Sequence, residues 1–152
     1  MVELMITIVI LGIASSLAIP SFQEFYANYR LRKASIDFMN ALTLAKSESV
    51  RRGQQVNVDP IGGAWTNGWT VNLAPTTILQ TFDPVTNIAI SKTDGDPLNQ
   101  ISFQNEGLRN DHLISGGNKI SFDVRFCDYR NRGRDVSIRV TGASNLSTVD
   151  CP

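Results

Sequence analysis

The apolar positions of the chain follow three successive patterns, and the first is an almost unbroken hydrophobic run. Residues 4–23 carry no charge, and the stretch from Leu4 to Ile19 is interrupted only by Gly12 and three small hydroxyl residues. At about 1.5 Å per residue, a helix of this length can cross the hydrocarbon core of a bilayer. Residues 1–23 therefore predict a hydrophobic transmembrane helix, and we expect Pro20 to bend it near its end.

The second pattern is that of an amphipathic helix over residues 24–52. Arg51 and Arg52 suit the last turn of such a helix, and Gly53 suits its left-handed cap. The apolar side chains recur at spacings of three and four and form one stripe, which consists of Leu31, Ala34, Phe38, Ala41, Leu42 and Ala45. The two helical segments join without a break, so the sequence predicts one long helix.

The third pattern has a period of two and predicts strands over residues 54–152. Turn residues such as Asn67-Gly68 and Asp83-Pro84 separate the runs. The apolar residues that mark these runs are Val56, Val58, Trp69, Val71, Leu73, Ile78, Ile88, Ile90, Ile101, Phe103, Ile120, Phe122, Val124, Phe126, Val136, Ile138 and Val140, and we expect a last strand near Leu146 to Cys151. We expect an α+β fold, in which the long helix packs on an antiparallel β-sheet domain of about seven strands. Residues 24–152 would form one soluble domain.

Composition and charge exclude several classes of function. The 14 basic residues balance the 14 acidic residues, so no domain-wide basicity indicates nucleic-acid binding. One histidine, His112, and two widely spaced cysteines give no zinc ligand set. Asp94 and Asp96 could bind calcium, but D-G-D-P lacks the further ligands of a calcium loop, and a solvated turn is the better interpretation.

No constellation of residues predicts catalysis. The sequence offers no nucleophile–base pair, and its Gly-Gly pairs lie in turns without a following helix or lysine. We therefore predict no catalytic residue, no metal, no cofactor and no small-molecule substrate. A membrane-anchored enzyme of the cell envelope is the alternative from another class.

Glu3 is the one charge among the first 23 residues. A carboxylate near the end of a membrane segment is costly unless it reaches the interface or a cationic partner, so it indicates function. An ordinary signal peptide would carry a basic region in its place. A plain single-span anchor would leave Glu3 unexplained.

Residues 1–6, M-V-E-L-M-I, resemble the second half of the N-terminal signature of type IV pilins and pseudopilins, G-F-T-L-V-E-L-M-I. In that family a dedicated peptidase cuts before the Phe and methylates the new amine, and the glutamate pairs with a neighbouring subunit during assembly. The resemblance assigns assembly roles to Glu3 and Pro20 and makes residues 1–23 a filament-core segment. The Gly-Phe-Thr and the basic leader are not in this sequence, so we expect Met1 to be an internal start or to lie within the mature chain.

Residues 28–54 sharpen the resemblance. They read N-Y-R-L-R-K-A-S-I-D-F-M-N-A-L-T-L-A-K-S-E-S-V-R-R-G-Q, which is similar to the helix of the GspH/FimT/FimU group. A Trp-rich turn such as residues 63–69 and a late cysteine pair also occur in that group. The resemblance implies a non-enzymatic, structural minor pilin at or near the tip of a type IV pilus, with other pilins as partners.

The same resemblance implies a location and two alternatives. The protein would be a single-pass inner-membrane protein with its C-terminal domain in the periplasm before it enters the filament. The alternatives are a DNA-binding minor pilin in DNA uptake and a minor pseudopilin of a type II secretion system.

Cys127 and Cys151 are the only cysteines. If the domain is exported, we expect a disulfide between them that fixes the last strand beside the strand ending at Phe126. Two unpaired, buried thiols are the alternative.

Four arginines in the C-terminal part, Arg130, Arg132, Arg134 and Arg139, could contact phosphates next to Tyr129. FimT-like proteins use a C-terminal G-R-x-R element to bind DNA, but residues 142–145 read G-A-S-N here and Gly133-Arg134 is only a displaced half-match. We expect a structural or partner-binding loop. DNA binding and an uninvolved solvated turn are the alternatives.

Overall fold

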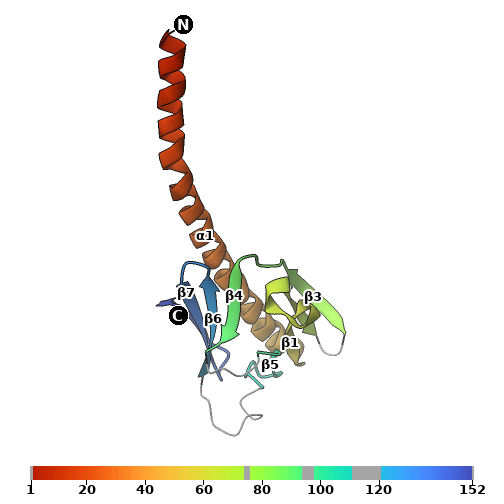
Figure 1. Cartoon of the computed structure of the whole chain (residues 1–152). Coiled ribbons are helices and arrows are strands. Elements are labelled where there is room, and N and C mark those ends of the chain that lie inside the picture. Colours follow the sequence, from red (N-terminus) through yellow and green to blue (C-terminus); the bar gives the residue numbers. More distant parts are fainter. Residues whose placement is uncertain (1, 74–75, 94–97, 111–120, 152) are drawn as a thin grey trace. The chain divides into compact units, whose positions relative to one another are not determined.

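The computed structural model describes residues 2–73, 76–93, 98–110 and 121–151; of residues 16–21, 121 and 122 it describes the backbone alone. These residues form one long helix and eight strands (Figure 1). The chain separates into two compact units, Met1–Arg30 and Leu31–Pro152, and each is described by itself. The predicted positions Asp94, Asp96, His112 and Ile120 lie outside the described residues.

The first unit is the N-terminal part of helix α1 (Val2–Arg52), which continues through Pro20. Its apolar side chains between Val2 and Ile13 are 54–70% exposed. The hydroxyl groups of Thr7 and Ser15 donate hydrogen bonds to the carbonyl groups four residues earlier, so they do not interrupt the helix. Among the residues that the structure describes, no helix is both long enough and apolar enough to cross a membrane. The transmembrane segment predicted over residues 1–23 stays a prediction.

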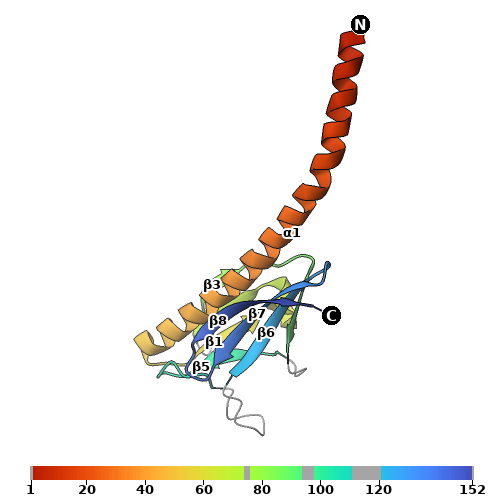
Figure 2. The same cartoon turned by 90° about the vertical axis from the view of Figure 1, so that its left-hand side faces the viewer.

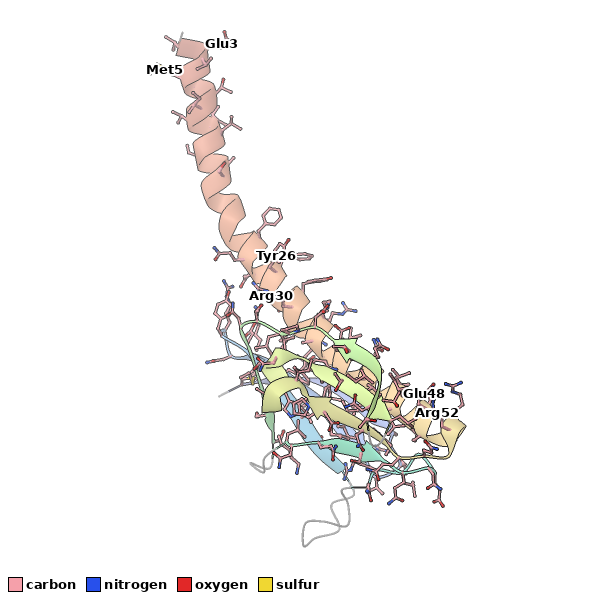
Figure 3. The ribbon with its side chains drawn as sticks, turned by 90° about the vertical axis from the view of Figure 1, so that its right-hand side faces the viewer. Glu3, Met5, Tyr26, Arg30, Glu48 and Arg52 are labelled. Atoms are coloured by element: carbon pink, nitrogen blue, oxygen red, sulfur yellow. A yellow bond between two sulfur atoms is a disulfide. The ribbon has the colours of Figure 1, made fainter. Side chains whose placement is uncertain are left out.

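The second unit begins with the amphipathic part of α1. Every member of the predicted stripe, Leu31, Ala34, Phe38, Ala41, Leu42 and Ala45, is at most 3% exposed. The helix ends as predicted, because Gly53 adopts a φ of 61° and Gln54 N donates to Ser49 O at 3.3 Å. In the last turn, hydrogen bonds from Arg51 and Arg52 lower the pKa of the Glu48 carboxyl to about 2 (Figure 3).

The strands of the second unit form two antiparallel sheets of four. Their bounds are β1 Val56–Pro60, β2 Trp69–Leu73, β3 Thr77–Phe82, β4 Ile88–Lys92, β5 Ile101–Phe103, β6 Ser121–Asp128, β7 Arg132–Arg139 and β8 Ser144–Asp150. The first sheet has the order β3-β2-β1-β5 and the second β4-β6-β7-β8. Two short 3-10 turns, η1 Ile61–Gly63 and η2 Trp65–Asn67, connect β1 to β2. The α+β fold is confirmed; the division into two sheets and the end of β7 before Val140 were not predicted.

The core of this unit is built around Phe38. Its ring makes edge contacts with Trp65, Trp69 and Phe126, at centroid distances of 5.5, 5.5 and 5.3 Å. Helix α1 supplies Phe38, while the region around β2 and the strand β6 supply the other rings, so one cluster joins the helix to both sheets. Such aromatic contacts add to the free energy gained from burying the rings.

A buried arginine makes a second connection between the sheets. Arg109 forms an isolated bridge with Phe103 of β5, and its guanidinium donates to the carbonyl oxygen of Ile138 in β7 at 2.6 Å. Its backbone N–H donates to Val140 O at 2.9 Å. No sequence pattern indicated this role, because residues 107–110 have no apolar period.

Candidate assembly segment and arginine hairpin

Glu3 lies in the first turn of α1, on an exposed and otherwise apolar helix (Figure 3). No ion pair or side-chain hydrogen bond involves its carboxylate among the described residues. The side chains around it, such as Met5 and Ile6, are more than half exposed. The segment therefore presents one carboxylate and many apolar groups that this part of the chain does not cover itself. Pro20 lies inside the same helix, and its side chain is outside the described residues.

The predicted disulfide is confirmed. Cys127 at the end of β6 is bonded to Cys151 just after β8, and their Cα atoms are 6.0 Å apart. The expected placement of the last strand is wrong, however. In the sheet order β7 lies between β6 and β8, so the bond spans a strand instead of joining two neighbours (Figure 2).

Gly133 of β7 makes that crossing feasible. It pairs with Cys127 on one side and with Val149 on the other. A Cβ atom at this position would lie 2.5 Å from Cys151 Sγ and 3.2 Å from the carbonyl oxygen of Phe126. Only glycine leaves room for the disulfide over the middle strand. In the sequence Gly133 belongs to an arginine-rich motif, and no local pattern indicates this role.

The turn between β6 and β7 is organised by Asp128, whose side chain is buried. One carboxylate oxygen accepts the backbone N–H groups of Arg130 and Arg132 at 2.9 and 3.0 Å, and the other accepts the Arg132 guanidinium at 3.1 and 3.0 Å. Burial alone would raise the pKa of the Asp128 carboxyl, but these donors outweigh it and lower the pKa below its ordinary value. The carboxylate therefore stays ionised and holds the turn.

The other arginines of the hairpin are placed separately. Arg130 lies over the Tyr129 ring, 5.3 Å from its centroid, and its Nε donates to the tyrosine hydroxyl at 3.2 Å. Arg134 is on the same face of β7 as Arg132, because the two are two residues apart on one strand. Arg139 is on the opposite face at the far end of the strand, about 23 Å from Arg132 at about 3.3 Å per residue.

Ion pairs further reduce the positive charge with which the hairpin could bind an anion. Arg125 binds the buried Asp135 through two hydrogen bonds of 2.9 Å, and the hydrogen bond to Asp135 raises the pKa of Arg125. Arg132 is likewise held by Asp128. The structure does not bring the four predicted arginines into one patch.

The described residues contain no cluster of side chains suited to metal binding. In the ranges 2–73, 76–93, 98–110 and 121–151, no group of three or more His, Cys, Asp or Glu side chains could hold a metal ion. An open groove of about 620 Å³ beside the hairpin turn is lined mainly by apolar atoms, and Asp128 is the one carboxylate among the described residues that line it. That carboxylate is already used by the turn.

Comparison with solved structures identifies the fold. The minor pilin FimU of the type IV system of Pseudomonas aeruginosa matches with a TM-score of 0.65 at 15% identity, over 84% of this chain and 99% of that chain. The minor pseudopilin EpsH of the type II secretion system of Vibrio cholerae matches with a TM-score of 0.52 at 13% identity, over 80% and 97% of the two chains. At such identities the likeness shows the fold alone, and that fold is the pilin fold.

The sequence then places the chain in a family. The family described as type II transport protein GspH matches residues 34–144, most of the chain, and the protein belongs to this family. The family and its structural neighbours are pilins and pseudopilins, which are structural filament subunits, and the protein is not an enzyme. No curated protein sequence gives a significant match.

Proposed function

We propose that the protein is a structural minor pilin of a type IV pilus that enters the filament through residues 2–23 and supports assembly at or near the tip. Its partners are other pilins. Before assembly it is held in the inner membrane, with residues 31–152 in the periplasm. The observation that carries the proposal is the Glu3 carboxylate, which has no ion-pair partner among the described residues and lies in a helical segment, residues 2–13, whose large apolar side chains are more than half exposed.

The exposed apolar side chains of residues 2–13 need an apolar surrounding that the described residues do not provide. Burying one exposed Leu or Ile side chain contributes about 1.5–3 kcal/mol, and residues 2–13 carry many such side chains. In that surrounding a lone carboxylate is destabilising, whereas an adjacent ammonium group makes it favourable. A neighbouring subunit with the same apolar helix and a free N-terminal amine would supply both, which agrees with the assembly role that the N-terminal resemblance implies for Glu3.

A minor pseudopilin of a type II secretion system is the second candidate. It is favoured by the description of the matching family and by the likeness to EpsH. Both candidates assemble through the same N-terminal segment. Deleting the chain in a cell that has both machines separates them, because one candidate predicts a loss of surface pili and the other a loss of protein secretion.

DNA binding is not part of the proposal. Arg132 is neutralised by Asp128, Arg130 is engaged with Tyr129, and Arg139 is on the other face of β7 from Arg132. A sequence-independent DNA site needs several cations along one surface. Arg132 instead uses its charge to hold the turn through Asp128.

The test compares two single carboxylate removals in cells that assemble filaments. Glu3→Gln should reduce the amount of the chain in purified filaments at least tenfold, which corresponds to about 1.4 kcal/mol. Glu106→Gln removes an exposed carboxylate of the β-domain and should leave incorporation unchanged. Equal incorporation of Glu3→Gln and wild type, measured by immunoblot of sheared filaments, would contradict the proposal.

A further inference from the structure

The two sheets have four edge strands, and three of them carry features that discourage pairing with another chain. In β3 the register with β2 shifts between Val71 and Asn72, which marks a bulge. Strand β5 has only three residues, and β4 ends in Lys92. Bulges, short edges and lysines are the usual means by which proteins prevent the addition of a foreign strand.

The fourth edge, β8, lacks all of these features. It is seven residues long, contains no proline, and carries no charge before Asp150. Its register with β7 runs without interruption from the pair Arg132 and Asp150 to the pair Ile138 and Ser144. By the criteria that identify an unprotected edge, β8 is open to strand addition.

The hydrogen bonds at the two ends of β8 show which backbone groups face outward. Arg139 N donates to Ala143 O at 2.9 Å, and Cys151 N donates to Asn131 O at 2.8 Å. In an antiparallel pair the bonded residues alternate along each strand, so the odd-numbered residues from 143 to 151 pair with β7. The even-numbered residues Ser144, Leu146, Thr148 and Asp150 therefore direct their N–H and C=O groups away from the sheet. No hydrogen bond from these backbone groups to another described residue is present.

The disulfide makes this edge rigid. Cys151 follows directly after β8 and is bonded to Cys127 across β7, so the end of the strand is held covalently in register. An edge that is already ordered loses little conformational entropy when a partner binds. The exposed side chains of β8 before Asp150 belong to Asn145, Ser147 and Thr148, and they are short and polar and would not block the approach of a partner.

We propose that β8 is a docking edge at which an extended, uncharged segment of a neighbouring filament subunit adds as a further strand to the β4-β6-β7-β8 sheet. This inference rests on the proposed function. The partner is recognised through its backbone, by β-strand addition. Its side chains beside β8 are hydroxyl-bearing or β-branched residues, which form favourable cross-strand pairs with Ser and Thr.

A second copy of the chain is a poorer occupant. If two β8 strands paired antiparallel in one continuous sheet, a two-fold axis would relate the two subunits. One entire subunit would then point in the opposite direction to the other. Subunits of one filament share one direction and meet through non-identical surfaces. A different strand of a neighbouring subunit fits this requirement.

The experiment uses the full chain in cells that assemble filaments, with a photo-crosslinking amino acid in place of Asn145. Irradiation should join the chain to another filament subunit, identified by mass spectrometry. The same probe in place of Thr81 on the bulged strand β3 should give no such product.

Two variants of the crosslinking chain test the mechanism. Thr148→Pro removes one outward N–H without touching the ladder to β7 and should lower the crosslink yield about tenfold. Thr148→Val is the matched control, because it keeps the N–H and should retain the yield. If Thr148→Pro lowers the thermal stability, Thr148→Lys places a charge on the edge without changing the backbone and should give the same loss.

Each outcome has a definite meaning. A crosslink that is lost in Thr148→Pro or Thr148→Lys and kept in Thr148→Val supports strand addition. Three outcomes would overturn the docking edge and leave the proposed function intact. They are a crosslink that survives both substitutions, a crosslink to a second copy alone, and no crosslink from a chain that is present in filaments. Absence of the wild-type chain from filaments would overturn the proposed function and, with it, this partner.

Discussion

Helix α1 has the same backbone structure in residues 2–15 and in residues 31–45, yet the two segments differ completely in what surrounds their side chains. In the first, every large apolar side chain is more than half exposed, and the single carboxylate has no ion-pair partner among the described residues. In the second, the apolar stripe is at most 3% exposed and packs against aromatic rings from both sheets.

The difference shows that helical structure alone says little about stability. A helix in a protein gains most of its stability from the packing of its apolar face. Residues 31–45 have that packing within their own unit, whereas the large apolar side chains of residues 2–15 are not covered by the described residues. The β-domain can therefore fold with its own core, while the function proposed for the N-terminal segment depends on assembly.

The two regions should differ most in how much the free energy of unfolding falls when one apolar side chain in each is truncated to alanine. Phe38→Ala removes the centre of the core and should lower the free energy of unfolding by about 3–5 kcal/mol. Leu11→Ala in the exposed segment should change it by less than about 0.5 kcal/mol. Denaturant unfolding of the full chain in mild detergent, followed by the fluorescence of Trp65 and Trp69, measures both. A large effect of Leu11→Ala on this transition would show that the first segment is part of the folded core.

Removing the disulfide should cause the next largest loss of stability. The cysteines are 24 residues apart, and the loop-entropy model gives a loss of about 3 kcal/mol in Cys127→Ser/Cys151→Ser. Reducing agent should shift the wild-type unfolding midpoint and leave that of the double variant unchanged. A wild-type midpoint that does not respond to reduction would contradict a stabilising bond.

Gly133→Ala should destabilise the β-domain by about 1–3 kcal/mol, because the new methyl group collides with the disulfide and with the backbone of β6. Gly133→Ala should be less destabilising when Cys127 and Cys151 are both serine, since Cys151 Sγ is the atom closest to the new Cβ. A double-mutant cycle on unfolding midpoints measures this coupling. Equal costs in both backgrounds would mean that glycine is needed for another reason.

The Asp128 interaction predicts a smaller, pH-dependent effect of about 1 kcal/mol. The folded pKa of Asp128 lies below its ordinary value of 3.8, so its contribution is complete above that value. The contribution is then lost as the pH falls through the lower folded pKa. Asp128→Asn should remove this part of the pH dependence between about pH 5 and pH 2. Identical stability profiles for the variant and wild type would refute the role of Asp128 in holding the turn.

The smallest effect is expected for DNA binding. The full chain should give no gel shift at physiological salt, and Arg132→Ala/Arg134→Ala should change nothing. If the four arginines acted together, affinity would fall with a log–log salt slope of about −3 to −4, and each Arg→Ala would reduce the slope by about one unit. Tight binding that the double variant abolishes would make DNA uptake the better function.

The sequence predicted what depends on periodicity. The stripe from Leu31 to Ala45 and the alternation in β6 and β7 each define a buried face. The stripe residues and Val124, Phe126, Val136 and Ile138 are in the core, whereas Val140, which continued the predicted alternation, is only partly buried. The cap at Gly53 was also predictable, because a helix ending in the left-handed conformation strongly favours glycine.

The features that were missed depend on contacts between distant segments. Nothing local indicates that β7 would lie between the two cysteines, so the reason for Gly133 could not be seen. The pairing of Arg132 with Asp128 and of Arg125 with Asp135 depends on the turn and the register of β6 against β7. Without these pairs the arginines appear in the sequence as one basic cluster.

The most direct test of the central claim is whether assembly buries the exposed segment. Val9→Cys, at a position that is 60% exposed in the single chain, should resist a soluble maleimide in purified, membrane-free filaments and react once urea dissociates them. Thr43→Cys, on the exposed face of the same helix within the second unit, should react in both states. Rapid labelling of Val9→Cys in intact filaments would contradict the claim that residues 2–23 form part of the filament core.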